Sequence, residues 1–406
     1  MRIALLVFAF VTLATPLAAR EWKEADGKTR FEADLVIVHK DKAIFEKPGG
    51  EIVVIPVSRL SPEDQAYLKT VAPAAKPVAP PATAASSNPA PARGVARLDL
   101  GGEPTKQVRR FDEMGWGVSS LAFSPQGLVA AGKMDRAVQL FDAVKEAKAA
   151  TEDKLEHLGQ VTCSAFSPAG DVLLTGGYTG QIQVWEVGKG GTLKRLHKYL
   201  GHSQQVRAIA FSPDGSRVLS GGEDAALHCW SVKDGRRVAA FDGFDHVMKA
   251  CHWTADGARA LATDGASLFE FDLKTSKEAR KVGLLRSWAA GQAAAFSPDG
   301  ATLVLGDRYD LRIFDTKTGK ELAKLADNEI QWTAAVTPDG TRLLTGAAGK
   351  VNVWDLKARE KVGSIDLAGT YYVQSLAASP DSRYVAASPA SAGQSLQVFR
   401  LPEPLK

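Results

Sequence analysis

Phe211-Ser212-Pro213-Asp214-Gly215 decides the fold, because near-copies of this stretch recur six more times along the chain. Proline presets the first position of a tight turn, and glycine adopts the positive φ that such a turn needs. Each copy therefore predicts a hairpin turn between two strands. Successive copies begin 43, 45, 42, 43, 40 and 42 residues apart. The seven copies begin at Phe123, Phe166, Phe211, Trp253, Phe296, Val336 and Ala378.

A β-rich segment ending in an aromatic residue follows each copy, as at Trp185, Trp230 and Trp354. A period near 42 with four short strands per unit is typical of propeller blades. On these repeats, residues 97–406 resemble the WD40 family. The resemblance implies an all-β fold in which seven blades form a β-propeller.

The last repeat ends at its third strand, Leu396–Phe399, with only a short tail after it. A propeller protects its strand edges only when the ring is closed. We expect Gln107–Phe111, which precedes the first repeat, to supply the missing outer strand. The closing pair would join the two ends of the domain, so loss of residues 97–112 should destabilise the whole ring.

Residues 20–70 predict a separate small module with strands at 31–38, 43–46 and 51–55. Ser61-Pro62 then predicts the start of a helix, with a capping serine followed by proline at the first helical position. The segment resembles the Sla1 homology domain 1 (SHD1), and the shared features are Arg20-x-Trp22, Asp26-Gly27-Lys28, Glu32-Ala33, Gly49-Gly50 and Leu60–Tyr67. The resemblance implies an SH3-like barrel, which in endocytic adaptors binds short Asn-Pro-Phe peptides.

Residues 71–96 are rich in alanine, proline and serine, which predicts an extended linker. Residues 1–19 contain one basic residue, an apolar run and a small-residue end at Ala18-Ala19, which predicts a signal peptide. We therefore expect an exported protein, periplasmic or extracellular, with no membrane span once the signal is removed. An uncleaved anchor is the alternative. A net charge of +4, spread along the chain, argues against a nucleic-acid partner.

Repeat three carries His202, Ser220, Asp224 and Trp230, which include the residue types of a nucleophilic triad. Their spacing follows the repeat, and no Gly-x-Ser-x-Gly elbow is present. The WD40 resemblance implies instead a buried chain of hydrogen bonds from Trp to Ser to His to Asp. Repeat two keeps three members of this tetrad, His157, Thr175 and Trp185. It has Thr179 at the Asp position.

The sequence predicts no catalytic residue, metal ligand or cofactor site. The remaining histidines lack metal-ligand spacing, and no phosphate loop or dinucleotide fingerprint occurs. The three cysteines, Cys163, Cys229 and Cys251, are expected as small buried apolar residues. A Cys229–Cys251 disulfide between adjacent blades is the alternative in an oxidising compartment.

The loops at one end of the propeller hold the residues that we predict to contact a partner. Exposed aromatic side chains are typical of binding hot spots, although packing under neighbouring loops is the alternative. The candidates are Trp116, Met134, Tyr178, Glu223, Trp288, Trp332, Tyr371 and Tyr372. The function expected is a non-enzymatic scaffold for protein or peptide partners. A carbohydrate or envelope-polymer binder and an enzyme with an active site at the channel mouth remain alternatives.

Overall fold

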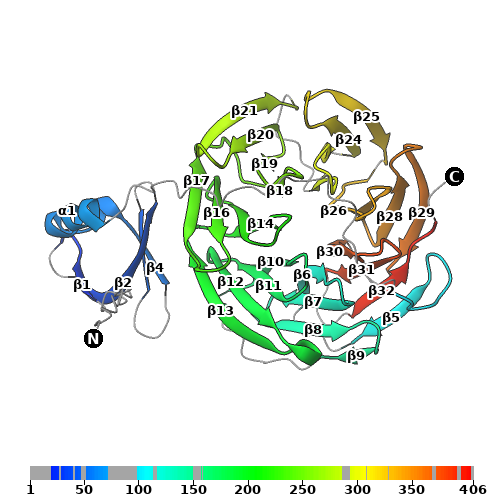
Figure 1. Ribbon diagram of the computed structural model, residues 1–406, viewed down its shortest axis with the longest axis horizontal. Helices are drawn as coiled ribbons and strands as arrows, with labels where there is room; N and C mark the ends of the chain where they lie inside the picture. Colours follow the sequence, from blue (N-terminus) through cyan, green and yellow to red (C-terminus); the bar gives the residue numbers. More distant parts are fainter. Residues whose placement is uncertain are drawn as a thin grey trace, which may run out of the picture. The chain divides into compact units, whose positions relative to one another are not determined.

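The chain divides into two compact units, Met1–Pro73 and Ala74–Lys406 (Figure 1). The predicted signal at 1–19 lies outside the described residues, as do residues 72–96 of the predicted linker and the candidates Trp116, Trp288 and Tyr371. The computed structural model describes residues 20–26, 29–39, 42–46, 52–71, 98–112, 117–149, 157, 159–285, 293–307, 309–327, 329–367, 372–390 and 395–403.

The first unit contains an antiparallel sheet whose four strands pair in chain order. A short 3-10 helix, η1 (Val57–Arg59), and the helix α1 (Pro62–Val71) follow the sheet. The sequence did not predict the first strand, and the helix includes Val71, which the linker prediction had claimed. The strands are β1 (Arg20–Lys23), β2 (Arg30–His39), β3 (Lys42–Glu46) and β4 (Ile52–Pro56).

Trp22 is the centre of this small core, where its ring lies 4.6 Å from that of Phe45 and 5.8 Å from that of Tyr67. Its indole N–H donates to the carbonyl of Ala33 at 2.8 Å, so the polar edge of the buried ring is satisfied. The helix begins at Pro62 as predicted. The Ser61 hydroxyl accepts the Asp64 N–H at 3.2 Å and donates to the Asp64 carboxylate at 3.0 Å. The SH3-like barrel and its peptide ligand stay predictions.

The described part of the second unit forms seven four-stranded antiparallel sheets, so the predicted seven-bladed all-β propeller is confirmed (Figure 1). The innermost strands of all seven sheets line one central cavity. A short 3-10 helix, η2 (Lys189–Gly191), separates the last two strands of blade 2.

Each blade has its strands in chain order from the centre outward, except that the last blade takes its outer strand from the start of the unit. Blade 1 contains β6 (Val118–Phe123), β7 (Leu128–Lys133), β8 (Val138–Asp142) and β9 (Ala147–Lys148). Blade 2 contains β10 (Val161–Phe166), β11 (Val172–Gly177), β12 (Gln181–Val187) and β13 (Leu193–Leu200). Blade 3 contains β14 (Val206–Phe211), β15 (Arg217–Gly222), β16 (Ala226–Ser231) and β17 (Arg237–Asp242).

The remaining blades repeat the same arrangement. Blade 4 contains β18 (Ala250–Trp253), β19 (Arg259–Thr263), β20 (Ser267–Asp272) and β21 (Lys277–Gly283). Blade 5 contains β22 (Ala294–Phe296), β23 (Thr302–Asp307), β24 (Asp310–Asp315) and β25 (Glu321–Ala326). Blade 6 contains β26 (Thr333–Val336), β27 (Arg342–Gly346), β28 (Lys350–Asp355) and β29 (Glu360–Asp366). Blade 7 contains β30 (Val373–Ala378), β31 (Tyr384–Pro389), β32 (Leu396–Arg400) and β5 (Gln107–Phe111).

The repeated stretch forms the turn between the first two strands of a blade, as predicted. In blade 3 the Gly215 N–H donates to the Ser212 carbonyl at 2.8 Å, with Gly215 at a φ of 71°. The buried Ser212 hydroxyl accepts the Arg217 N–H at 2.9 Å, which ties the turn to the next strand. The glycine of the motif thus supplies the positive φ of the turn, and the serine hydroxyl holds the turn to the next strand.

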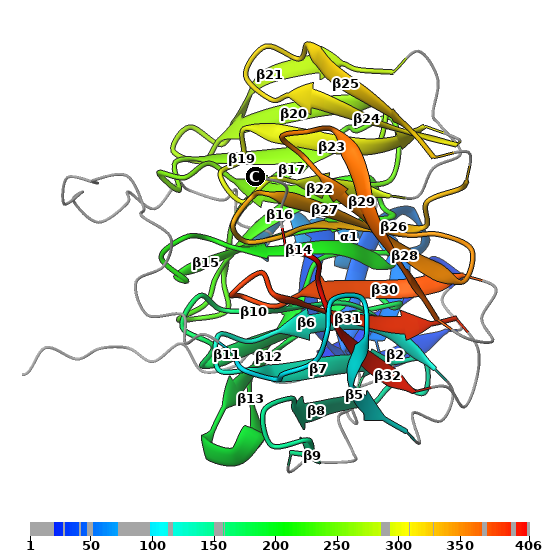
Figure 2. The same cartoon turned by 90° about the vertical axis from the view of Figure 1, so that its right-hand side faces the viewer.

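The closing strand predicted at Gln107–Phe111 is confirmed, because β5 pairs antiparallel with β32 in the register Leu396↔Phe111 and Val398↔Arg109. Figures 1 and 2 both show the two strands side by side. The segment before β5 adds further long-range bonds to blade 7. The Leu98 N–H donates to the Asp381 carboxylate at 2.8 Å, and the Leu100 N–H to the Tyr384 hydroxyl at 3.0 Å.

We expect Phe111→Ala to weaken the entire ring. Phe111 is buried, and its ring lies 4.8 Å from that of Phe141 in blade 1, so truncation leaves a cavity at the closing seam. Such truncations cost about 3–5 kcal/mol. Urea unfolding followed by tryptophan fluorescence should show one transition at lower urea, whereas the exposed Lys106→Ala control should leave the midpoint unchanged. A separate early transition with the main midpoint retained would contradict cooperative closure.

Candidate functional site

The connections between blades and the turns between second and third strands lie at one end of the disc, because the four strands of each blade alternate in direction. We call this end the crown. Among the described candidate residues, Met134, Tyr178 and Glu223 lie in turns between second and third strands. Trp332 and Tyr372 precede the innermost strands of blades 6 and 7.

Blade 3 contains a continuous chain of hydrogen bonds beneath the crown. The Trp230 indole N–H donates to the Ser220 hydroxyl at 2.8 Å, and His202 Nε2 lies 2.8 Å from the same oxygen. His202 Nδ1 lies 3.0 Å from the Asp224 carboxylate. Ser220, His202 and Asp224 are all buried in their side chains, and the serine already bonds tryptophan. The arrangement ties the loop before β14 to β15 and β16, and it does not present a nucleophile to substrate.

Blade 2 keeps the inner part of this chain but leaves the histidine incomplete. The Trp185 N–H donates to the Thr175 hydroxyl at 2.9 Å, and His157 Nε2 lies 2.7 Å from it. The buried Nδ1 atom of His157 has no hydrogen-bond partner among the described residues. Burial, reinforced by the charge of Lys198, lowers the pKa of His157 from 6.5 to about 4. Its imidazole is therefore neutral near pH 7.

Thr179 should accept a stabilising substitution, because it stands four residues after Thr175 just as Asp224 stands four after Ser220. A methyl group at Gly177 would lie 3.0 Å from His157 Nδ1, and one at Gly222 would lie 2.7 Å from His202 Nδ1. The two rings thus have equivalent positions. We expect Thr179→Asp to accept the Nδ1 proton and to raise the free energy of unfolding at pH 7 by about 1 kcal/mol, the usual net worth of one hydrogen bond.

The same substitution should change the pH dependence of stability. In the native chain the unfolded state binds more protons between pH 6.5 and about 4, so the free energy of unfolding falls as pH decreases through this window. The loss reaches about 3 kcal/mol below pH 4. Thr179→Asp raises the pKa of His157 and should reduce this fall, whereas Thr179→Ala should not. The free energy of unfolding of each variant is measured by urea unfolding at several pH values. If it falls equally with decreasing pH in Thr179→Asp and Thr179→Ala, position 179 does not face His157 Nδ1.

Blade 6 replaces the histidine with a carboxylate that the sequence analysis missed. Asp327 stands nine residues before Val336, the offset that places His202 before Phe211. Its buried carboxylate accepts the Asn352 amide at 2.7 Å and the Lys361 ammonium at 2.6 Å. The Trp354 N–H still donates to Thr345 at 3.2 Å. The offset from the turn motif was the signal that could have identified Asp327.

Exposed apolar side chains gather on the crown. Met134 is 37% exposed, Tyr178 59% and Trp332 40%, and the Trp332 ring lies 5.0 Å from that of Tyr372. Tyr309, at 55%, lies in the equivalent turn of blade 5 and was not predicted. Its position between the second and third strands was the available signal.

Glu223 is engaged inside the propeller crown rather than free. Its carboxylate accepts two hydrogen bonds from Arg207, from Nε at 2.9 Å and from Nη2 at 2.6 Å. Arg207 stands near the crown end of β14, and Glu223 lies in the crown turn between β15 and β16. Glu223 therefore orients a cation that sequence reasoning did not select.

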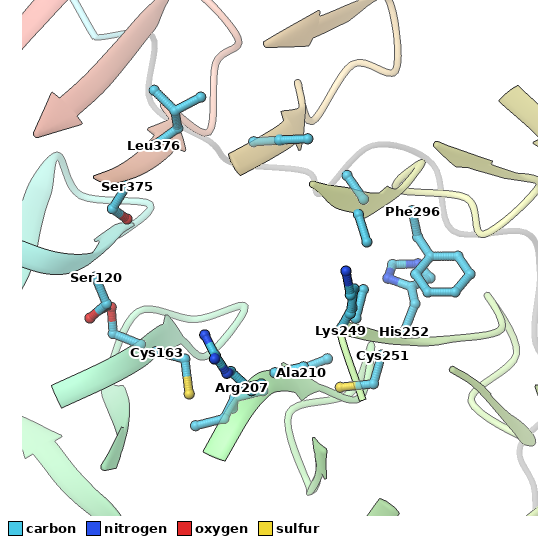
Figure 3. A pocket seen from close by; sticks show the side chains of 18 of the residues that line it. Ser120, Cys163, Arg207, Ala210, Lys249, Cys251, His252, Phe296, Ser375 and Leu376 are labelled. Atoms are coloured by element: carbon cyan, nitrogen blue, oxygen red, sulfur yellow. Dashed lines mark hydrogen bonds between the residues drawn. The ribbon is translucent and has the colours of Figure 1, made fainter. Parts of the chain in front are cut away.

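The central cavity encloses about 390 Å³ and is lined mostly by small side chains from the inner strands. Figure 3 shows Arg207 and Lys249 on its wall, with His252 and Phe296 nearby. Among the described residues no group of three or more His, Cys, Asp or Glu side chains could hold a metal ion.

All three cysteines are free thiols, so the alternative of a Cys229–Cys251 disulfide does not hold in this structure. Burial raises the pKa of Cys163 and of Cys229 to about 12 and also raises that of Cys251. Each is therefore a protonated thiol near neutral pH. Cys229 and Cys251 are buried, as expected, whereas Cys163 is half-buried.

Residues 152–186 and 193–231 match the family model for the WD domain, G-beta repeat. These segments end in blades 2 and 3, the blades that carry the Trp–hydroxyl–His hydrogen bonds. Curated proteins show no match to this chain. The chain thus contains WD40 repeats within a seven-bladed propeller. No helix among the described residues is long and apolar enough to cross a membrane.

Proposed function

We propose that this protein is a non-enzymatic scaffold that binds a protein or peptide partner on the crown of the propeller. One observation carries the proposal: the distribution of exposed large apolar side chains. The described residues expose seven such side chains, and four of them lie on the crown. These four are Met134, Tyr178, Tyr309 and Trp332. The other three, Val144, Leu196 and Leu322, lie at the opposite end or on outer strands.

The crown side chains project from backbone that is already held in place. The N–H of Tyr178 donates to the Gln160 carbonyl at 2.8 Å, that of Trp332 to Gly346 at 2.8 Å, and that of Met134 to Gly117 at 3.2 Å. Preorganised loops lose little conformational entropy on binding, and large aromatic side chains supply much contact area per rotatable bond. WD40 propellers are commonly used for protein–protein interaction, which supports the same assignment.

Two other functions compete with this proposal. The Trp332–Tyr372 pair would also suit a carbohydrate or envelope polymer, because a sugar ring can pack against an aromatic face. An enzyme would require reactive groups converging at the channel mouth. The carbohydrate binder is the stronger competitor, since it uses the same exposed rings.

Alanine variants of the crown should separate these functions. We expect Tyr178→Ala and Trp332→Ala each to weaken capture of a protein partner from the source cells by about tenfold, the loss typical of a hot-spot side chain. Leu196→Ala is the matched control, because Leu196 is also 40% exposed but lies on an outer strand. Tryptophan-fluorescence titrations with oligosaccharides complete the test. Saturable sugar binding lost in Trp332→Ala, with protein capture unchanged, would favour the carbohydrate function.

The proposal includes action outside the cytoplasm, which rests on the order of charged, apolar and small residues in segment 1–19. We expect the mature protein to begin at Arg20. Intact-mass measurement of the protein purified from its natural source should show loss of the first 19 residues, and Ala19→Asp should block that loss. A cytoplasmic protein that keeps Met1 would contradict export.

A further inference from the structure

The position four residues before each turn motif has different chemistry around the ring. In blades 1 and 2 it holds Ser119 and Thr162, whose hydroxyls donate to the next blade at Val161 O, 2.5 Å away, and Val206 O, 2.6 Å away. In blades 3 and 4 the same position holds the cations Arg207 and Lys249. This position therefore joins neighbouring blades on one side of the ring and carries two adjacent positive charges on the next.

Both cations line the central cavity at its crown end, because each stands at the start of an innermost strand (Figure 3). Glu223 accepts from Nε and Nη2 of Arg207 and so fixes the plane of the guanidinium. Nη1 lies outside that ion pair, and the Arg207 side chain is 45% exposed. A guanidinium held along one edge can still donate to an oxyanion along another.

Lys249 is half-buried at the wall of the cavity, where removal from water disfavours its charged form. Burial is the largest cause that lowers the pKa of Lys249 from 10.5 to about 8, and the positive charge of Arg207 lowers it further. The negative charge of Asp264 opposes this shift. Within the described parts of the chain, the charges of Arg207 on β14 and of Asp264 after β19 both act on Lys249. An anion beside this ammonium would favour its charged form and would be attracted by both cations.

The same ring position carries an aromatic side chain in blade 6, where Trp332 stands four residues before Val336. A ligand entering the crown therefore meets cations on blades 3 and 4 and an exposed indole on blade 6. This pattern complements a segment that bears both carboxylates and apolar side chains.

We propose that Arg207 and Lys249 form a carboxylate-binding site at the crown mouth of the channel, and that it receives an acidic peptide segment of the partner. This inference rests on the proposed function of the crown and adds the chemistry of its partner. The oxyanion would accept from Nη1 of Arg207 and from the Lys249 ammonium, while apolar side chains of the same segment contact Trp332.

A pair of labelled peptides tests the site in the full chain. One alternates glutamate and leucine over eight residues, and the other has glutamine in place of glutamate. Fluorescence polarisation should show that the glutamate peptide binds at least tenfold more tightly and that added salt weakens it. Arg207→Ala and Lys249→Met should each weaken binding about tenfold. Lys274→Met is the control, because the exposed Lys274 lies in the same blade at the opposite end.

The pH dependence adds a readout specific to Lys249. Affinity for the glutamate peptide should fall about tenfold between pH 7 and pH 9, as the ammonium loses its proton near pH 8. Lys249→Arg should bind with little change over this range, since a guanidinium stays charged. The peptide should also protect Lys249 from acylation, as measured by peptide mapping of the unaltered protein.

Equal binding of the two peptides, or equal losses in Lys249→Met and Lys274→Met, would overturn the proposal. Displacement of the peptide by inorganic phosphate, but not by sodium chloride at equal ionic strength, would assign the site to a free anion and overturn the peptide ligand. If Trp332→Ala abolishes partner capture while the cation variants retain it, the crown function stands and only this inference fails. If no crown variant affects capture while the glutamate peptide still binds through Arg207 and Lys249, the carboxylate site stands, but the crown function and the assignment of the peptide to its partner fail.

Discussion

Closure of the ring by β5 and β32 is the constraint on which the rest of this structure depends. The pairing joins Phe111 to Leu396 and is reinforced where Arg383 donates to the Leu98 carbonyl at 2.9 Å. Without it, the outer edge of blade 7 would be an open strand, and the seam with blade 1 would lose part of its buried core. Because all seven innermost strands converge on one cavity, the crown loops keep their relative positions only while the ring stays closed.

The repeat supplies equivalent positions, and the protein uses them unequally. One hydrogen-bond position holds His202 in a complete chain, His157 in an incomplete one and Asp327 in a different network. The sheets tolerate these differences because packed strands supply most of the stability of every blade. The same freedom allows one repeat position to hold a hydroxyl that joins blade 1 to blade 2, another that joins blade 2 to blade 3, and cations that line the channel in blades 3 and 4. Equivalent positions in different blades therefore differ in chemistry because they hold different residues.

Several features were predictable because their signals are local and periodic. The turns at Phe211–Gly215 and its copies specify their own backbone geometry, and seven copies specify seven blades. The closing strand could be predicted because the last repeat has only three strands of its own and a blade needs four. The strand Arg20–Lys23 was missed because four residues carry little periodicity. Asp327 was not predicted because the tetrad pattern specifies histidine at that offset, and an aspartate bonded to Asn352 and Lys361 has no counterpart in the pattern.

By itself, the sequence determined the fold class, the number of blades, the turn chemistry and the strand that closes the ring. These features depend on spacing and local backbone preference, which can be read along the chain. Only the tertiary structure decided that Glu223 is engaged by Arg207, that Tyr309 belongs with the exposed crown residues and that Arg207 and Lys249 line one cavity. Exposure and charge pairing depend on which blades become neighbours and on how side chains of different strands meet. The repeat sets where each position lies, and closure of the ring decides what surrounds it.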